Sequence, residues 1–369
     1  MGPMHGLRGR TTILLLTALA SVSLAALPAR AQSGQSAAKW EIEGHGGGLF
    51  LTGSTGDGPP VLPPPGAAIA TSSPVFPSRR VPSWFFGDGA TLLNQVNQQF
   101  GVAGRIAPLD TALGGSSVNV GNGFAAGVRA RRILTGRLWL EFGIDFFPGA
   151  VGQSEELLAA AAAARDSFGP AFEGLLATGP FSGVSVDATS SSGGSSLEMA
   201  ATAAVQYRFG DGASLTPYIT LGGGLVSGLG GGPSVMLEGH YRFDILGEVP
   251  IDETDRLTIR QETTTTAVGV LGAGLRRDVT DRWGFNVDGR VLIGQGATRV
   301  VVDAEPSVST GTPGDFVESF TTPSIQFSND PATGRESSLG APGLDGFETF
   351  SADRLRARII ITAGIYWRF

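Results

Sequence analysis

Few side chains in this chain of 369 residues have the types and spacing that chemistry requires. The chain has no cysteine, which excludes disulfides, thiolate nucleophiles and cysteine-ligated zinc. Of its three histidines, only His45 and His240 lie beyond the N-terminal segment. Two histidines so far apart in sequence form no metal-ligand spacing. We therefore predict no metal site and no cofactor.

His240 is the candidate for acid–base work, because it lies in the segment EGHY and the chain is rich in serine. A Ser–His–acid site stays open, although the chain contains no G-x-S-x-G elbow. Asp252, Glu253 and Asp255 could hold a weak surface cation or form a solvated loop tip, and we favour the loop tip. His45 is interpreted as a buried, paired histidine. We therefore assign no catalytic residue and predict that the protein is not an enzyme.

Most other ionisable side chains follow a period of two, which is the signature of strands. In the last stretch, Arg354–Phe369, one side is apolar and ends in aromatic residues, whereas the other carries arginine, hydroxyl groups and glycine. If the apolar side faces lipid, the charged side faces the lumen of a barrel. The charged side chains predicted to line this lumen are Glu41, Glu43, His45, Arg129, Arg131, Glu141, Asp145, Glu198, Arg208, Asp288, Arg290, Arg358 and Arg368.

These luminal charges allow two interpretations. An eight-stranded barrel is only about wide enough for side chains to fill, so the charges could form a network of ion pairs and water that plugs it. The alternative is a narrow ion path along the same charges. We favour the plug. On the lipid side, Trp283, Trp367 and Phe369 are predicted to belong to the aromatic girdle of a membrane barrel.

Composition and the N-terminus indicate an exported protein. Arg8 and Arg10 precede the apolar run Ile13–Leu27 and an A-x-A site at Ala29–Ala31, so residues 1–31 are predicted to be a signal peptide and the mature chain to start at Gln32. Glycine, at 56 residues, is about twice its usual share. A net charge of −7 argues against a nucleic-acid partner.

The mature chain, residues 32–369, alternates predicted strands with connections of contrasting length. Three short turns lie at Leu134–Arg137, Gly210–Ser214 and Asp278–Arg282. Long extracellular inserts are predicted at about 55–123, 148–195, 230–265 and 299–353. Eight strands, short turns on one side and long loops on the other are typical of outer-membrane barrels. The predicted fold is all-β: an eight-stranded antiparallel transmembrane barrel with long, partly helical extracellular loops.

The inserts contain further elements. Leu92, Leu93, Val96 and Phe100 have helical spacing, and Ser154 is a predicted N-cap for an alanine-rich helix. The tract 189–196 is interpreted as flexible. The third insert is predicted to be a hairpin that prolongs its flanking strands. The aromatic residues at 84–86 are predicted to pack the loops into a cap, with a membrane-interface anchor or a ligand site as alternatives.

Three stretches carry a resemblance to a known group: GIYWRF at the end, PYITLGGGLV at Pro217–Val226, and VQYRFGDGASLTPYI across a short turn. They resemble the eight-stranded outer-membrane barrels such as the OmpA transmembrane domain, OmpX and OmpW. The resemblance implies a location in the Gram-negative outer membrane, contact with its lipid and lipopolysaccharide, and recognition of the C-terminal strand by the barrel-assembly machinery.

Three functions remain at this stage. The first is a structural or surface-interaction role, carried by the large loops and an unknown extracellular ligand. The second is transport, through a narrow porin-like pore or a lateral path for a small apolar molecule. The third is a membrane-embedded lipid hydrolase.

Overall fold

The computed structural model describes residues 40–52, 58–64, 79–179, 181–210, 215–245, 249–307, 326–327, 337–339 and 343–369. The chain divides into two units, Met1–Lys39 and Trp40–Phe369, and all described residues lie in the second. The predicted signal peptide and the mature start at Gln32 therefore lie outside the described residues.

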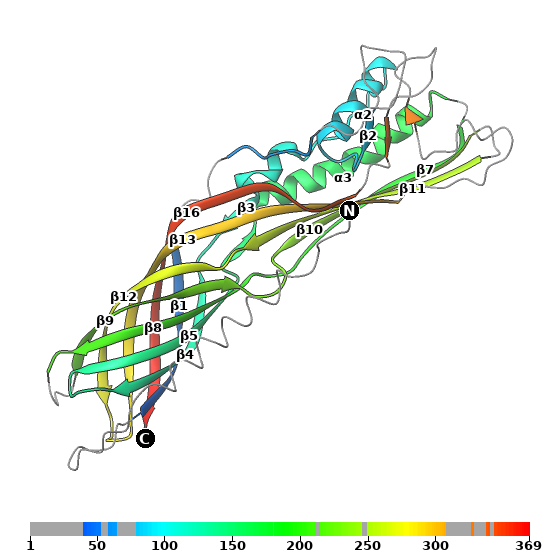
Figure 1. The fold of residues 1–369 in the computed structure, drawn as a ribbon. Helices are drawn as coiled ribbons and strands as arrows, with labels where there is room; N and C mark the ends of the chain where they lie inside the picture. Colours follow the sequence, from blue (N-terminus) through cyan, green and yellow to red (C-terminus); the bar gives the residue numbers. More distant parts are fainter. Residues whose placement is uncertain are drawn as a thin grey trace, which may run out of the picture. The chain divides into compact units, whose positions relative to one another are not determined.

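Eight antiparallel strands close into a barrel, as predicted (Figure 1). Each barrel strand pairs with the barrel strand that follows it in the sequence. The barrel closes where the last strand, β16, pairs with the first, β1, and Glu41 lies opposite Arg368. The barrel strands are β1 (Trp40–Thr52), β4 (Gly123–Ile133), β5 (Leu138–Pro148), β8 (Leu197–Arg208), β9 (Thr216–Gly228), β12 (Thr266–Asp278), β13 (Trp283–Ser307) and β16 (Leu344–Arg368).

Alternation of the side chains fixes what faces in and what faces out. In β1, Glu41, Glu43 and His45 are buried in the lumen while Ile42 is exposed. The pairing of β1 with both neighbours runs without a break through its three consecutive glycines, Gly46–Gly48. The same parity therefore holds to Leu49, which is buried, and Phe50, which is exposed.

Two barrel strands continue well beyond the barrel. The second half of β13 leaves β12 and pairs with β11 instead, while it stays paired with β16. Beyond β11 follow β10 and β7, so one side of the barrel wall continues as a five-stranded sheet. The added strands are β7 (Phe181–Gly193), β10 (Ser234–Ile245) and β11 (Val249–Thr263). The predicted hairpin of the third insert is thus confirmed.

Two sequence-based expectations differ from this sheet. The tract 189–196 is not flexible as predicted, because most of it belongs to β7, which pairs with β10. The predicted fourth insert, 299–353, begins and ends in strand, since β13 extends to Ser307 and β16 starts at Leu344.

Two helices, α2 (Gly87–Gln99) and α3 (Glu155–Leu176), cover one face of the five-stranded sheet (Figure 1). The predicted N-cap of α3 is confirmed, because the Ser154 side chain accepts a hydrogen bond from the backbone of Leu157. We call the five-stranded sheet with these helices the cap. Its core is one apolar cluster from both helices and from β10, β11, β13 and β16.

The remaining elements are short. Two 3-10 helices span Asp110–Leu113 and Gly115–Ser117. A two-stranded sheet joins β3 (Val118–Val120) to β6 (Val151–Gln153), and a three-stranded one joins β2 (Arg79–Val81), β15 (Ser337–Leu339) and β14 (Gln326–Phe327). Within the described ranges, neither helix has the length and apolar composition of a membrane-spanning helix.

Candidate functional site

The middle of the barrel lumen is filled by paired charges. Arg290 binds Glu141 through Nη1 at 2.5 Å and Asp288 through Nε at 2.5 Å. Arg131 donates to Glu141 at 2.7 Å and to Glu41 at 2.9 Å. These five side chains come from four strands and are all at most 2% exposed. Charges so thoroughly withdrawn from water are tolerable only when paired and hydrogen-bonded.

The same layer includes His45. His45 Nε2 lies 2.5 Å from Asp145 and its Nδ1 lies 3.5 Å from Glu43, which also accepts from Arg129 at 3.1 Å. Tyr218 adds a hydrogen bond to the network by donating to Asp288 at 2.7 Å. His45 is therefore buried between carboxylates, as the sequence suggested.

At the end with the short turns, cations stack on aromatic rings. The guanidinium groups of Arg208 and Arg276 each lie 4.6 Å from the centre of the Trp139 ring, and Arg368 lies 5.9 Å from it. Arg276 also binds Glu41 at 2.6 Å. The buried Trp139 ring is therefore a platform for three arginines.

An apolar layer follows on the cap side of the charged layer. Each of the eight barrel strands contributes at least one buried side chain to it. Its members are Leu49, Ala125, Phe147, Ala150, Ala200, Val226, Val268, Val270, Leu292 and Ile360. Apolar side chains from all eight barrel strands therefore lie between the charged layer and the cap.

Luminal glycines make room for these side chains. A Cβ added to Gly364 would lie 2.8 Å from Glu43 Oε1 and 2.7 Å from Asn286 Oδ1. A Cβ on Gly127 would lie 2.8 Å from His45 Nε2. Luminal side chains therefore already occupy the space beside these two glycines.

A third luminal layer lies between the apolar layer and the cap. Glu198 accepts from Arg358 through both oxygens, at 3.1 Å from Nε and 3.2 Å from Nη2. Arg356 lies two residues earlier on the same face of β16 and is 2% exposed. Within the described residues, no carboxylate lies within ion-pair distance of Arg356, and its Nε and Nη2 have no hydrogen-bond partner.

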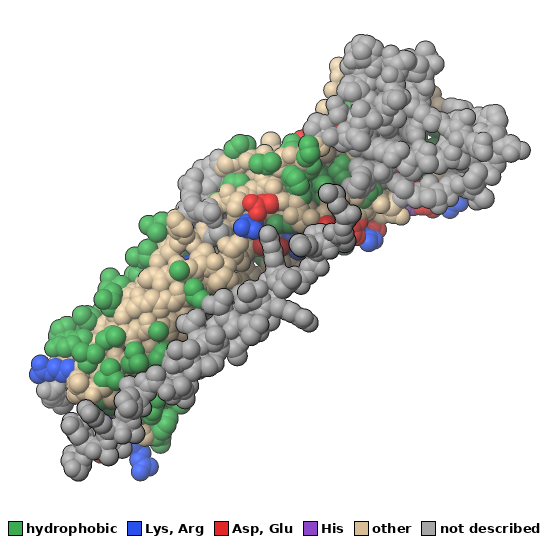
Figure 2. All heavy atoms as spheres, viewed as in Figure 1, with side chains coloured by type: hydrophobic (Ala, Val, Ile, Leu, Met, Phe, Trp, Pro, Cys, Tyr) green, Lys and Arg blue, Asp and Glu red, His purple; other side chains and the backbone are tan. Residues whose placement is uncertain are grey.

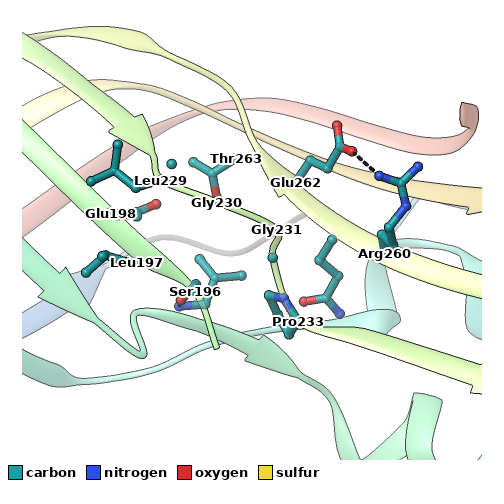
Figure 3. A pocket seen from close by; sticks show the side chains of 14 residues that line it. Ser196, Leu197, Glu198, Leu229, Gly230, Gly231, Pro233, Arg260, Glu262 and Thr263 are labelled. Carbon is teal, nitrogen blue, oxygen red and sulfur yellow. Dashed lines mark hydrogen bonds and ion pairs between the residues drawn. The ribbon is translucent and has the colours of Figure 1, made fainter. Parts of the chain in front are cut away.

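A pocket of about 240 Å³ opens beside this layer (Figure 3). It lies where the sheet is interrupted: the pairing of β8 with β9 ends at Glu198 and Gly228, and that of β10 with β11 starts at Ser234 and Arg260. Its lining comes from Val151, residues 196–198, residues 228–233 and residues 260–263. Glu198, whose carboxylate holds Arg358, is thus part of the lining of this rim pocket.

The predicted luminal residues can now be placed. All thirteen lie on the luminal face, and eleven are at most 8% exposed; Arg208 and Arg368, at the short-turn end, are partly buried. Twelve of them form ion pairs or hydrogen bonds with one another: ten around the charged layer and its short-turn end, and Glu198 with Arg358 as a separate pair. Arg208 instead stacks on Trp139. Alternation could not reveal the contributions of Tyr218 and Asn286, which are uncharged but join the same network.

The outer surface of the barrel is apolar. Trp283, Trp367 and Phe369 are exposed by 36%, 52% and 64%, and Trp283 lies opposite Trp367 in the sheet. Hydrophobic side chains spread over the barrel in Figure 2, and most acidic and basic side chains on this face lie closer to the cap. A closed sheet leaves no unpaired edge, which is the condition for spanning lipid with strands. The chain therefore forms an integral membrane barrel of the outer-membrane type.

The acidic cluster of the third insert is not a solvated loop tip, so that interpretation is wrong. Glu253 and Asp255 are 1% and 0% exposed, because they lie on the cap-core side of β11, and only Asp252 faces outward. Asp255 Oδ2 accepts from Ser83 at 3.0 Å and from the backbone of Trp84 at 2.6 Å. Burial raises the pKa of Asp255 to about 7, although these two hydrogen bonds oppose the shift.

The aromatic residues at 84–86 are core residues of the cap, which confirms the preferred interpretation. All three are at most 2% exposed. The indole of Trp84 donates to the Tyr241 hydroxyl at 3.1 Å, and that hydroxyl donates to Glu253 at 2.7 Å. This chain of bonds anchors the segment before α2 to β10 and β11.

His240 lies on the opposite, outward face of the cap sheet. Its two ring nitrogens contact Asp187 at 3.2 Å and Asp252 at 2.8 Å. Partial burial lowers the pKa of His240, but the hydrogen bonds to Asp252 and Asp187 outweigh it and leave the pKa raised. Both nitrogens therefore face carboxylates, and neither contacts a serine hydroxyl among the described residues. The described residues contain no cluster that could hold a metal ion.

Comparison with known proteins adds little. No family model and no curated protein matches the sequence. Among solved structures, the chain is similar to the outer membrane protein OprG from Pseudomonas aeruginosa, with 9% identity, 91% of this chain and 98% of that chain covered, and a TM-score of 0.36. It is also similar to an outer membrane channel from Pseudomonas putida F1, with 12% identity, coverage of 93% and 100%, and a TM-score of 0.21. The barrel is established by its own strand pairing.

Proposed function

We propose that this protein is a barrel closed along its axis, whose function is to display the cap at the cell surface as an interaction surface. The filled lumen carries the proposal: a charged layer, an apolar layer and the layer of Arg358 succeed one another along the axis. An axial pore would need a hydrated path through all three. A packed barrel instead gives a rigid base to the cap.

The outward face of the cap sheet is the proposed interaction surface. It is polar, and ion pairs connect its neighbouring strands: Arg256 pairs with Glu238 at 2.7 Å, and Arg260 pairs with Asp303 at 2.7 Å. Such a face favours a polar partner over an apolar one. The outer-membrane lipid and lipopolysaccharide around the barrel, and the assembly machinery that would recognise the strand ending in Phe369, remain proposed partners.

Two experiments test the display function. In a planar bilayer, the folded protein should show no steady axial conductance, and Arg290→Ala serves as the comparison variant. If the native protein shows a steady conductance and the Arg290→Ala variant changes that conductance, the closed axis is contradicted. Because the chain has no cysteine, a single Arg256→Cys change gives a clean label site, which an impermeant maleimide should reach on intact cells. Failure of that label while the protein is folded would contradict display.

The second candidate function is passage of a small molecule through the rim pocket. The observation that favours it is the interruption of the sheet between Glu198 and Arg260, where the pocket lies. A Gly231→Trp change should obstruct the pocket, because Gly231 belongs to its lining and an added Cβ there meets no atom within 4 Å. Gly136→Trp, in a short turn, is the matched control. Equal solute uptake by both variants in vesicles would reject this route. The lipid hydrolase has no comparable support.

A further inference from the structure

Buried carboxylates outnumber buried arginines in the charged layer, but the reverse holds in the third luminal layer on its cap side. Five buried carboxylates of the charged layer face four buried arginines and His45; the carboxylates are Glu41, Glu43, Glu141, Asp145 and Asp288, and the arginines are Arg129, Arg131, Arg276 and Arg290. The third luminal layer has two buried arginines, Arg356 and Arg358, and one carboxylate, Glu198. Counted over the described residues, this third luminal layer therefore carries one excess positive charge.

The surroundings make that excess costly. On one side lies the apolar layer, which includes Leu292, the residue opposite Arg358 in the sheet, and Ile360. On the other side lies the apolar core of the cap, which includes Val300 and Phe350. Burying a guanidinium between two apolar layers costs desolvation free energy unless an anion pairs with it.

The free donors point to an anion. Arg356 Nε and Nη2 and Arg358 Nη1 are buried and have no hydrogen-bond partner among the described residues. Guanidinium groups bind carboxylates through two parallel hydrogen bonds. Arg358 already holds Glu198 in this way, which leaves Arg356 as the group able to take a second carboxylate.

The rim pocket limits the size and character of the ligand. Its volume of about 240 Å³ is below the range of roughly 300–1,000 Å³ that drug-sized ligands occupy. Figure 3 shows Glu198 at this pocket together with the apolar side chains of Leu197, Leu229 and Pro233. Neither Arg356 nor Arg358 lines the pocket, but Glu198 does and binds Arg358, so the pocket adjoins the layer that holds the free donors. An anion with a small apolar body matches the apolar lining and those donors.

We propose that Arg356, together with Nη1 of Arg358, binds the carboxylate of a small organic anion that enters through the rim pocket. The proposal does not depend on the display function. A barrel without axial conductance can still bind such an anion, and a conducting barrel would leave the anion site intact.

The test uses the full folded protein in a nonionic detergent, with benzoate as the probe and benzyl alcohol as its neutral counterpart. Isothermal titration should show that benzoate binds the native protein at least about tenfold more tightly than benzyl alcohol does. Arg356→Gln should raise the Kd for benzoate by about tenfold or more, which corresponds to at least about 1.4 kcal/mol. Arg299→Gln, a matched change at an exposed arginine of β13 that pairs with Glu348, should leave the Kd unchanged.

Three results would overturn the anion site. They are absence of benzoate binding to the native protein, equal affinity for benzyl alcohol, and an Arg356→Gln variant that binds benzoate as the native protein does. Heat-dependent migration on a detergent gel shows whether each variant is folded. If Arg356→Gln does not fold, Arg356→Lys serves instead; it keeps the charge but loses the planar fork, so its Kd for benzoate should rise, and an unchanged Kd would count against the site.

Discussion

Ionisation of the buried Asp255 should weaken the cap as the pH rises, and Asp255→Asn should abolish this dependence. The carboxyl group is fully buried and accepts two hydrogen bonds on Oδ2, whereas Oδ1 has no partner among the described residues. Because the folded pKa of about 7 lies above the ordinary value of 3.8, the folded cap binds more protons than the unfolded cap between those pH values. Its stability must therefore fall as the pH rises from about 4 to about 7.

The size of the effect follows from the shift. A difference of about three pKa units, at 1.36 kcal/mol for each, amounts to about 4 kcal/mol between the two ends of this pH range. Asparagine has the shape of the protonated acid and cannot ionise. The variant should resemble the native protein near pH 4 and have a more stable cap than the native protein near pH 8.

Hydrogen exchange measures this effect locally. The amides of α2 follow directly after the segment that Asp255 anchors, so their protection, corrected for the intrinsic pH dependence of exchange, should fall from pH 4 to pH 8 in the native protein. Amides of β4 and β5, in the barrel, are the internal control. Flat protection of α2 over this pH range, or the same slope in Asp255→Asn, would refute the reasoning.

Three further predictions concern the lumen and the outer face of the cap. Arg358→Gln leaves the buried Glu198 carboxylate without its partner and should lower the free energy of unfolding in urea by about 3–5 kcal/mol. Arg356→Gln removes an uncompensated charge, so its free energy of unfolding should be unchanged or higher. Equal losses in the two variants would contradict the difference in pairing. Gly364→Ala should cost about 1–3 kcal/mol because its Cβ meets a glutamate oxygen, whereas Gly44→Ala, with open space, should cost less; the same urea assay compares them. The pKa of His240, measured by NMR, should lie above its ordinary value and fall when either flanking aspartate is changed to asparagine; an unchanged pKa would show that the pairing is absent in solution.

The barrel could be predicted because its signals are local. Alternation in β1 places Glu41 and Glu43 inside and Ile42 outside, and a period of two needs no knowledge of the partner strand. The three-residue glycine run did not shift this parity, since the pairing continues through it. Which arginine pairs with which carboxylate could not be predicted, because Arg276 and Glu41 are 235 residues apart.

The cap was harder to predict for physical reasons. In β11 the core side reads Ile251, Glu253, Asp255, Leu257, so two acidic residues break the apolar pattern that marks a buried face. Their partners, a serine, a backbone amide and a tyrosine, lie on other segments. The strand β7 was not predicted, because its serine-rich sequence has low strand propensity and because it pairs on one side only, with β10.

The unbroken passage of β13 and β16 from barrel to cap has a consequence for the order of folding. Both parts need β16, because it pairs with β13 in the cap and with β1 in the barrel, more than 300 residues away in the chain. Neither the ring of strands nor the cap sheet can be completed before the C-terminal strand arrives. Pairing β1 with β16 closes a very long loop, and this closure costs conformational entropy before the new contacts offset it. We therefore expect cap and barrel to mature in one slow, concerted step at the end of assembly.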